Sequence, residues 1–445
     1  MTQQPFRLNR RAFLQRFGVT ALTAPFIARG LLADSPNEKV NHASFGANGM
    51  AWSDLSELCK HPSFHLQAVA EVDLNRTKHV KERFPEARIY QDWREMLEKE
   101  KGLDSVNVST PDHMHAPMGM SAMQLGYHVY GQKPLTHDLY ETRQLTNAAR
   151  EKRLVTQMGI QIHSSWVYRL GVRLIQDFAI GKVREVHTWS SKKWGDTGPM
   201  PTRVDPVPAE FNWDAWLGVC EPRPFIGDGW YHPANWRKRL DFGTGTFGDM
   251  GCHIYDPVFK ALALTAPVSV RSEGPAPNEH SWAIDAVIHY VFPGTAYTEG
   301  ESVKVTWYDG DARPPADVLA LLGDRKQPDQ GSIFIGTKGV MVLPHVDKPI
   351  LLPADQFKDY SWPQISGNDH WAQFIDACMG KGQTAAHFGY AGPLTEAVLL
   401  GSVATRFPHT TLQWNAPRLT FDNVPEANRF VRRQYRAGWE VKGLS

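Results

Sequence analysis

Short apolar runs alternate with helical stretches between Val40 and Met158, and this alternation limits the possible folds more than any other feature. The runs predict strands at Val40–Phe45, Leu66–Val72, Asp104–Val108, Tyr127–Tyr130 and Leu154–Met158. The stretches between them suit right-handed helical crossovers and predict helices at Met50–Lys60, Leu74–Arg83, Trp93–Glu100, Ala116–Leu125 and Leu139–Lys152. Strands that alternate with helices predict a doubly wound α/β domain with a parallel sheet.

The pattern changes after a predicted helix at Trp166–Ile180. Period-two runs follow at Val183–Trp189, Ala283–Phe292, Ser302–Tyr308 and Gly339–Leu343, with no obligatory helix between them. Such runs predict a second, α+β domain whose sheet is largely antiparallel. A chain of 445 residues is long enough for two cores, and we expect domains at residues 38–160 and 161–445. The Trp-rich segment Lys192–Thr246 is too long for a simple connection, so we expect it to be functional.

The first 33 residues differ from the rest. Asn9-Arg10-Arg11-Ala12-Phe13-Leu14 precedes an uncharged stretch from Phe17 to Ala28. This pattern predicts a cleaved twin-arginine export signal, because the apolar stretch is shorter than the ~20 residues that span a bilayer. The alternative is a basic amphipathic first helix. We therefore expect a periplasmic or otherwise exported protein without a membrane anchor.

Charge and cysteine content exclude several classes of partner. The 48 Lys and Arg residues balance 47 Asp and Glu residues, so no field would attract nucleic acid. Four cysteines are scattered without a Cys-x-x-Cys pair, which argues against a zinc or redox motif. We expect no metal site and four buried free thiols, at Cys59, Cys220, Cys252 and Cys378.

The segment Gly46-Ala47-Asn48-Gly49-Met50-Ala51 lies between a predicted strand and a predicted helix. This is the context that the dinucleotide-binding pattern Gly-x-Gly-x-x-Gly/Ala requires in a Rossmann domain. Its glycines let backbone N–H groups approach a diphosphate at a helix N-terminus. The predicted cofactor contacts here are Gly46, Asn48, Gly49 and Met50. Asn48 departs from the pattern and narrows the approach, and the alternative is a turn without a ligand.

An acid at the end of the second predicted strand would bind the cofactor's ribose. Glu71 follows Gly46 by 25 residues, and Asp73 is the competing assignment. A carboxylate there favours NAD, whereas NADP would need a cation such as Arg76 beside its 2'-phosphate. For both acids the alternative is a solvated strand end.

The segments Ser109–His115 and Gly131–Pro134 follow the predicted strands Asp104–Val108 and Tyr127–Tyr130, at the sheet edge where α/β proteins bind ligands. They resemble the Thr-Pro-x-x-x-His and Glu-Lys-Pro segments of the Gfo/Idh/MocA (glucose-fructose oxidoreductase/inositol dehydrogenase) family. The resemblance implies cofactor contacts by Ser109, Pro111, His115, Gln132 and Lys133. Gln132 stands where the family has Glu, so we do not expect that acid's contact to be retained. A metal on His113 and His115 is not expected, because no third ligand is nearby.

Asp249 and His253 would share one face of a helix if residues 249–256 are helical. They match the family's Asp-x-x-x-His pair, which with Lys133 implies a catalytic trio. Oxidation of a secondary alcohol needs a base with a pKa near the working pH. We assign His253 as this base, Lys133 as the cation that stabilises the alkoxide, and Asp249 as the group that orients them.

Further residues are predicted to contact the substrate. The resemblance extends to Gln157–His163 at the domain junction and implies substrate contacts by Gln161 and His163. Asp256, the last residue of the Asp249 segment, is a further predicted substrate contact. Aromatic faces stack on sugars and polar ends orient hydroxyls, so Tyr231, Trp236 and Arg237 are predicted to line a sugar site. The alternative for them is a small core that holds the long loop.

These features predict an NAD(P)-dependent oxidoreductase that acts on a ring hydroxyl of a sugar or glycoside. Because twin-arginine export carries folded proteins, we expect a tightly held cofactor, NAD or also NADP. The alternatives are a redox glycosidase, which oxidises, eliminates, hydrates and re-reduces its substrate, and a noncatalytic sugar-binding protein. We also expect a homo-oligomer that forms through the antiparallel sheet, as in relatives.

Overall fold

The computed structural model describes residues 39–445, and the predicted export signal at residues 1–33 lies outside the described residues. The first part of the described chain forms a six-stranded sheet in the order β3-β2-β1-β4-β5-β6. Its strands are all parallel: β1 (Val40–Phe45), β2 (Phe64–Ala70), β3 (Arg88–Tyr90), β4 (Ser105–Val108), β5 (His128–Gly131) and β6 (Thr156–Met158). The predicted doubly wound parallel sheet is therefore confirmed. The prediction missed β3, which has only three residues and is partly exposed at the sheet edge.

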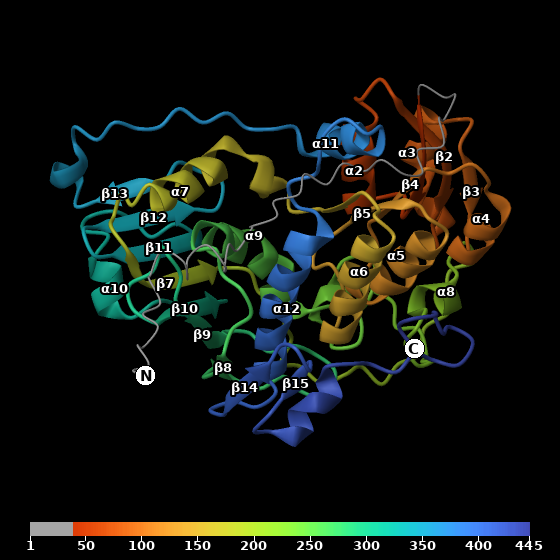
Figure 1. Ribbon diagram of the computed structural model, residues 1–445. Helices are drawn as coiled ribbons and strands as arrows, with labels where there is room; N and C mark the ends of the chain where they lie inside the picture. The colour runs from red at the N-terminus through yellow and green to blue at the C-terminus, as the bar shows by residue number, and fades with distance from the viewer. Residues whose placement is uncertain (1–38) are drawn as a thin grey trace, which may run out of the picture. The chain divides into compact units, whose positions relative to one another are not determined.

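Helices connect these strands and cover the sheet (Figure 1). They are α2 (Met50–Leu58), α3 (Lys78–Arg83), α4 (Trp93–Lys99), α5 (His115–Gln124) and α6 (Leu139–Glu151). The predicted helix at Leu74–Arg83 is broken, because a 3-10 turn at Leu74–Arg76 precedes α3. The Asp73 side chain caps that turn by accepting from the Asn75 N–H, and Thr77 Oγ1 donates to the Leu74 carbonyl. Side chains of this kind compete with helical hydrogen bonds and shorten the helix.

The second sheet has nine strands in the order β13-β12-β11-β7-β10-β9-β8-β14-β15. Its central strands are β7 (Val183–Ser190), β10 (Ser302–Asp309) and β9 (Val287–Pro293). All neighbouring strands are antiparallel except β7 and β10, which are parallel. The other strands are β8 (Ser269–Ser272), β11 (Gln330–Gly336), β12 (Val340–Pro344), β13 (Ile350–Leu352), β14 (Thr411–Asn415) and β15 (Thr420–Phe421). The largely antiparallel second sheet is confirmed.

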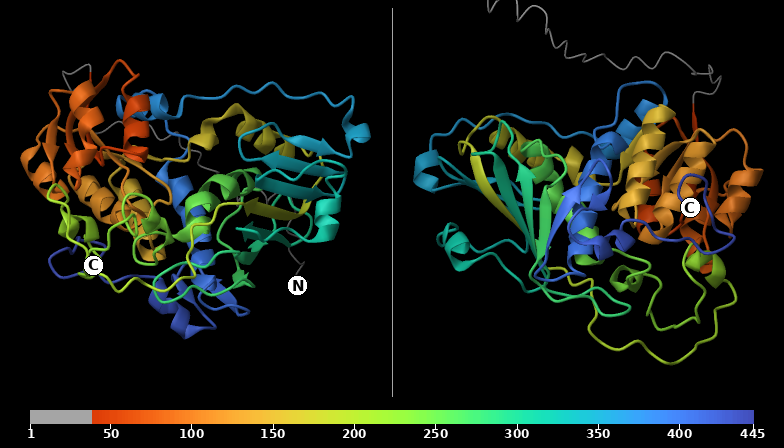
Figure 2. Two further views of the ribbon diagram at one scale, coloured as in Figure 1. Left: turned by 180° about the vertical axis from the view of Figure 1, so that it is seen from behind. Right: turned by 60° about the horizontal axis from the view of Figure 1, so that its bottom comes forward.

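The two longest described helices are α9 (Gly245–Ala261) and α12 (Phe388–Ala404), and α12 contacts β6 of the first sheet and β8 of the second. Helix α12 packs against α6 on one side and α9 on the other, and both views in Figure 2 show it between the sheets. Nearly every residue of α12 is buried, which fits its mostly apolar sequence. The remaining helices are α7 (Trp166–Gln176), α8 (Trp213–Leu217), α10 (Ala316–Ala320) and α11 (His370–Cys378).

An aromatic cluster orders the long segment between β7 and α9. Its members are Phe211, Trp213, Trp216, Leu217, Cys220, Ile226, Tyr231, Trp236 and Phe242. The segment also joins the first sheet, since the Asn212 N–H donates to the Val72 carbonyl and the Leu74 N–H to the Glu210 carbonyl. These bonds place a part of the chain distant in sequence beside the end of β2.

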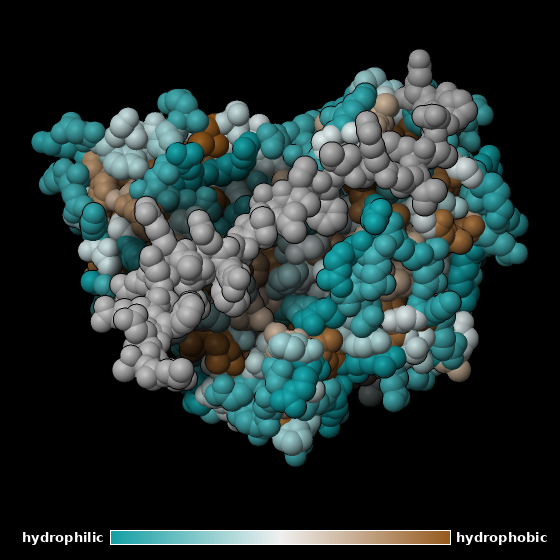
Figure 3. Space-filling view, viewed as in Figure 1, coloured by the Kyte–Doolittle hydropathy of each residue, from teal (hydrophilic) through white to brown (hydrophobic). Residues whose placement is uncertain are grey.

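The surface is mostly hydrophilic on the face shown in Figure 3, where apolar residues form small separate groups. Within residues 39–445, we find no helix with the length and apolarity needed to cross a membrane. The four cysteines are free thiols, and Cys220 and Cys252 are buried. The prediction of burial is wrong for Cys59 and Cys378, which are partly exposed.

Candidate active site

The glycine-rich loop between β1 and α2 has the backbone shape of a dinucleotide cradle. Gly46 has a φ of +103°, and a Cβ added there would lie 2.8 Å from the Ser109 carbonyl oxygen, so only glycine fits. Gly49 caps α2 with a φ of +58°, and a Cβ there would meet nothing within 4 Å. The loop is therefore closely packed at Gly46 and open at Gly49. Gly49 lies at the N-terminus of a helix, where an anion is favoured.

Asn48 changes this cradle in a specific way. Its Oδ1 accepts the Gly49 N–H at 2.6 Å, and its Nδ2 donates to the Arg76 carbonyl at 3.4 Å. The Gly49 N–H thus already has a partner within the protein. A diphosphate would have to displace that contact or use the neighbouring N–H groups, among them that of Met50.

Glu71 and Asp73 have different positions after β2. The Glu71 carboxylate accepts the N–H groups of Ala47 at 2.9 Å and Asp73 at 3.1 Å. Glu71 therefore holds the glycine loop from below, which argues against its predicted contact with the ribose. Asp73 accepts from Asn75 and lies 3.1 Å from Nε2 of His232, on the long segment. Both acids thus have partners within the protein, and the Asp73 side chain is 14% exposed.

The loops after β4 and β5 are held together by His115. Its Nδ1 lies 2.7 Å from the Pro134 carbonyl oxygen and its Nε2 lies 2.8 Å from that of Thr110. With both ring nitrogens engaged and only 3% of the residue exposed, His115 is a brace between the loops. Its predicted cofactor contact therefore does not fit the structure, whereas Ser109 and Pro111 on the same loop remain partly exposed.

Lys133 and Asp249 meet although they are 116 residues apart. Lys133 Nζ lies 2.7 Å from Asp249 Oδ1, and Arg237 Nε lies 3.3 Å from the same oxygen. The two side chains of the Lys133–Asp249 pair are 12% and 14% exposed, so solvent screens the pair only weakly. Burial alone would raise the pKa of Asp249, but the charges of Lys133 and Arg237 hold it well below its usual range. Asp249 is a carboxylate shared by two cations.

His253 follows Asp249 by one turn of α9, which makes residues 249–256 helical as predicted. Burial and the nearby charge of Lys133 lower the pKa of His253 well below its ordinary value. This corrects the expectation of a pKa near the working pH, because the lowered pKa leaves the imidazole neutral at pH 7. Its Nδ1 is buried without a partner in the described part of the chain, so Nε2 is the nitrogen that can meet a substrate.

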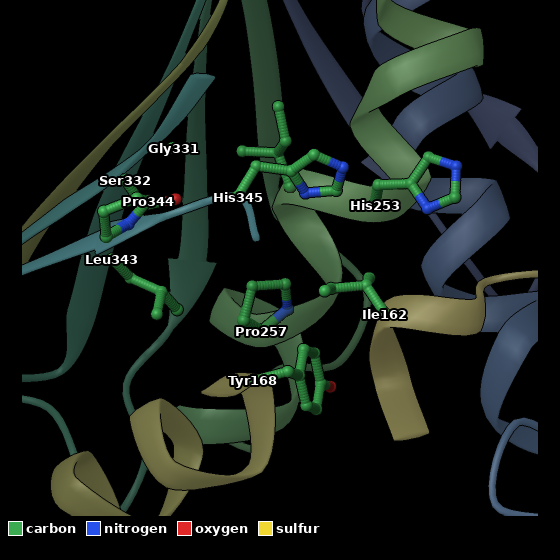
Figure 4. A pocket seen from close by; sticks show the side chains of 10 residues that line it. Ile162, Tyr168, His253, Pro257, Gly331, Ser332, Leu343, Pro344 and His345 are labelled. Atoms are coloured by element: carbon green, nitrogen blue, oxygen red, sulfur yellow. The ribbon is translucent and has the colours of Figure 1, made fainter. Parts of the chain in front are cut away.

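A small cavity lies beside His253. Figure 4 shows its lining, with the His345 ring turned toward His253, and the ring centroids are 5.5 Å apart. Its volume is about 10 Å³, about the size of one water molecule. Ser332 Oγ, also in the lining, is another buried polar atom without a partner among residues 39–445. Burial and Lys133 lower the pKa of His345 to about 4, so His345 is neutral at pH 7.

His163 and Asp256 form a buried pair behind the trio. Nδ1 of His163 lies 2.9 Å from Asp256 Oδ2, and the hydroxyls of Tyr168 and Tyr390 donate to Oδ1 of the same carboxylate. Asp256 is fully buried, which excludes its predicted contact with a substrate. Gln161 remains partly exposed, and its Nε2 lies 3.5 Å from the Tyr130 hydroxyl.

Three predicted sugar-lining residues separate into two groups. Tyr231 and Trp236 are buried members of the aromatic cluster, as the local-core alternative predicts. Arg237 is partly exposed; it stacks on the Trp236 ring with Cζ 4.2 Å from the centroid and contacts Asp249. The aromatic cluster therefore supports Arg237, and Arg237 alone of the three contacts Asp249.

Comparison with protein families matches both parts of the described chain. Residues 40–160 match an oxidoreductase family described as having an NAD-binding Rossmann fold. Residues 180–315 match the C-terminal alpha/beta domain of the same family. The chain belongs to the Gfo/Idh/MocA oxidoreductase family. The resemblance inferred from the motifs is confirmed at this level, and so is an NAD-binding Rossmann domain.

Curated relatives of this Gfo/Idh/MocA chain are distant. Levoglucosan dehydrogenase of Pseudarthrobacter phenanthrenivorans is 21% identical over 191 residues, which cover 43% of this chain and 40% of the relative. The scyllo-inositol 2-dehydrogenase (NADP(+)) of Bacillus subtilis is 23% identical over 219 residues, which cover 49% of this chain and 50% of the relative. The chain thus spans about half the length of these relatives or less.

Solved structures share the fold over most of the chain. The WlbA dehydrogenase from Bordetella pertussis, in complex with NADH and UDP-GlcNAcA, has a TM-score of 0.59 at 13% identity. The match covers 85% of this chain and 98% of that one. An aldose-aldose oxidoreductase from Caulobacter crescentus, complexed with glycerol, has a TM-score of 0.54 at 15% identity and is covered fully, against 84% of this chain.

Two residues near the site were missed by the sequence analysis. His345 follows β12, about 90 residues after His253, in no motif that points to it. Asp54 could have been found, because it lies on the buried stripe of α2 with Ala51, Leu55 and Leu58. An acid at helical spacing within an apolar stripe needs buried partners.

Proposed function

We propose that this protein is an NAD(P)-dependent oxidoreductase that oxidises a ring hydroxyl of a sugar or glycoside by hydride transfer. The observation that carries the proposal is the 2.7 Å contact between Lys133 Nζ and Asp249 Oδ1. It brings the end of β5 to helix α9, which also carries His253. A cation, a carboxylate and a neutral imidazole at one place suit the oxidation of an alcohol.

The residues of the cradle fit a dinucleotide. Gly46 and Gly49 provide the tight turn and the open face at the N-terminus of α2, and the Asp73 carboxylate would accept hydrogen bonds from a ribose. Ser109, Pro111, Gln132 and Lys133 would lie on the nicotinamide side, after β4 and β5. Bound NAD(P)+ would supply the hydride acceptor. The carboxylate of Asp73 favours NAD, as the sequence predicts.

The chain's own residues would handle the proton. His253 accepts the hydroxyl proton at Nε2, which its lowered pKa keeps free at pH 7. Lys133 lies next to the hydroxyl oxygen and stabilises the negative charge that develops there. Asp249 holds Lys133 in place, and Arg237 keeps the Asp249 carboxylate ionised and oriented.

The substrate class rests on the relatives. Levoglucosan and scyllo-inositol, which appear in their names, are cyclic polyols with secondary ring hydroxyls. A ring hydroxyl is therefore the group that we propose for this chain. We also propose twin-arginine export, a tightly held cofactor that a second sugar returns to its starting state, and a homo-oligomer. The export proposal rests on Arg10 and Arg11 in their sequence context.

The test begins with protein purified without added cofactor. The protein is denatured, and the supernatant is analysed by mass spectrometry and absorbance for NAD(H) and NADP(H). Native protein is then mixed with a panel of sugars and glycosides while absorbance at the nicotinamide band is followed. Stoichiometric cofactor whose redox state changes with a sugar supports the proposal and identifies the substrate class.

Two other results would redirect the assignment. Release of an aglycone without lasting reduced cofactor would favour the redox glycosidase. A protein without cofactor, which also fails to respond to added NAD+ or NADP+, would favour the noncatalytic sugar-binding protein and contradict the proposal.

A further inference from the structure

A buried carboxylate lies beneath the cofactor edge of the first sheet. Asp54, on α2, is fully buried and makes no ion pair within residues 39–445. Its Oδ2 accepts hydrogen bonds from Ser109 Oγ and Gln132 Nε2, both at 2.8 Å. Its Oδ1 accepts from Trp371 Nε1 at 3.1 Å. Three neutral donors from the β4 loop, the β5 loop and α11 thus converge on one carboxylate.

The carboxylate fixes the orientation of the Gln132 amide. A carboxylate only accepts hydrogen bonds, so the NH2 group of Gln132 must face Asp54. Its Oε1 then faces the other way and accepts the Lys133 N–H at 3.4 Å. Gly159 closes the third side, since a Cβ there would lie 2.5 Å from Gln132 Nε2. The amide cannot flip or move without disturbing Lys133.

This arrangement favours glutamine over glutamate at position 132. A glutamate at position 132 would bring a second acceptor against the Asp54 carboxylate, with no donor between them. Two buried like charges at such a distance repel strongly. With the acid Asp54 on α2 and the amide Gln132 on the β5 loop, the pair carries a single negative charge.

We propose that Asp54 and Gln132 act as one unit that positions Lys133 and Ser109 at the active site, with Asp54 as its anchor. Asp54 is a positioning residue, because it reaches the reacting groups only through Gln132 and Ser109. The catalytic part of this inference rests on the proposed function. The structural part, the mutual dependence of the two side chains, does not.

The test exchanges the acid and the amide. Four proteins are compared: wild type, Asp54→Asn, Gln132→Glu, and the double variant that carries both changes. In the double variant the amide on α2 donates to the acid on the β5 loop, so the pair regains one charge and one donor. Gln356→Glu is the matched control, because it makes the same change at an exposed amide. Three quantities are measured for each protein: the unfolding temperature, the NAD+ affinity by calorimetry, and the single-turnover rate of NAD+ reduction. The reductant is the sugar that the substrate panel identifies.

We expect Gln132→Glu to lower the unfolding temperature markedly and the double variant to recover most of that loss. At temperatures where all are folded, Asp54→Asn should bind NAD+ within about threefold of wild type and reduce it at least ~10-fold more slowly, since small misplacements near the reacting atoms are costly. The double variant should regain most of this rate. A purely structural role would change the unfolding temperature and leave the rate of the folded protein unchanged.

The proposal is overturned if the double variant shows only the sum of the two single effects in stability and rate. If Gln132→Glu does not fold, Gln132→Met removes the donor without adding a charge, and an unchanged rate in that variant also overturns the proposal. If wild type reduces no NAD+ with any sugar, the proposed function fails. The unfolding temperatures of the four proteins still decide whether Asp54 and Gln132 depend on each other.

Discussion

Two carboxylates, Asp249 on α9 and Asp54 on α2, contact the neighbouring residues Lys133 and Gln132 and differ in every partner. Asp249 contacts two cations, Lys133 and Arg237, and its pKa is held below its usual range. Asp54 contacts only neutral donors, and burial raises its pKa to about 6. The first region concentrates charge where a reaction would develop charge. The second region orders loops around a single charge without neutralising it.

The largest effect is expected from removing the cation of the first region. Lys133→Ala should leave the protein folded and cofactor-bound but slow the reduction of nicotinamide by roughly 100-fold or more. The measurement is single-turnover absorbance with the sugar identified above. Lys358→Ala, at an exposed lysine, is the control. Turnover like that of wild type in Lys133→Ala would contradict the assignment.

Variants of His253 and Lys133 test whether the charge of Lys133 sets the pH range in which the enzyme works. His253→Ala should also lose roughly 100-fold or more of the rate. Because burial and Lys133 lower the pKa of His253, the wild-type rate should stay level from pH 8 to 6.5 and decline only below 6.5. Lys133→Met should move this decline to higher pH in whatever rate remains. A wild-type decline centred at or above pH 6.5 would sink this account.

Asp54 should give the opposite dependence on pH, and the quantity that shows it is the free energy of unfolding. The Asp54 pKa is 3.8 when unfolded and about 6 when folded, so between these values the folded state binds more protons. The free energy of unfolding therefore falls as pH rises through this window. Relative to Asp54→Asn, wild type should lose on the order of 2 kcal/mol between about pH 4 and pH 7. Denaturant titrations of both proteins at several pH values measure this, and a difference independent of pH would refute it.

The smallest effect is expected from Tyr231→Phe, because Tyr231 lies in the aromatic cluster and not among the charged residues around Asp249. The Tyr231 hydroxyl is buried without a partner in the described chain, inside the aromatic cluster. Tyr231→Phe should therefore change stability by less than about 1 kcal/mol and leave turnover unaltered. Steady-state kinetics and thermal unfolding check this. A large rise in the KM for the sugar would contradict this expectation and show that Tyr231 contacts the substrate.

Local pattern predicted much of the fold. Strand β1 has the predicted bounds, and the glycine loop and Lys133 follow strands as expected. Apolar periodicity reports burial directly, which is why runs matching β7, β9, β10 and β12 were predicted, but the largely buried strand β11 was missed. Short edge strands such as β3 and β13 carry too few residues for a period. The broken helix after β2 depended on capping by Asp73, a side-chain effect that periodicity does not register.

The sequence by itself determined the two kinds of sheet and the cofactor loop, because these depend on neighbours along the chain, and the trio was implied by the family resemblance. Only the tertiary structure decided that Arg237 joins Asp249 while Trp236 beside it is buried, and that Glu71 holds the loop instead of a ribose. It also decided that Asp54 meets Gln132, 78 residues away. Burial and partners set the charge state of each group, and residues far apart in the chain supply both.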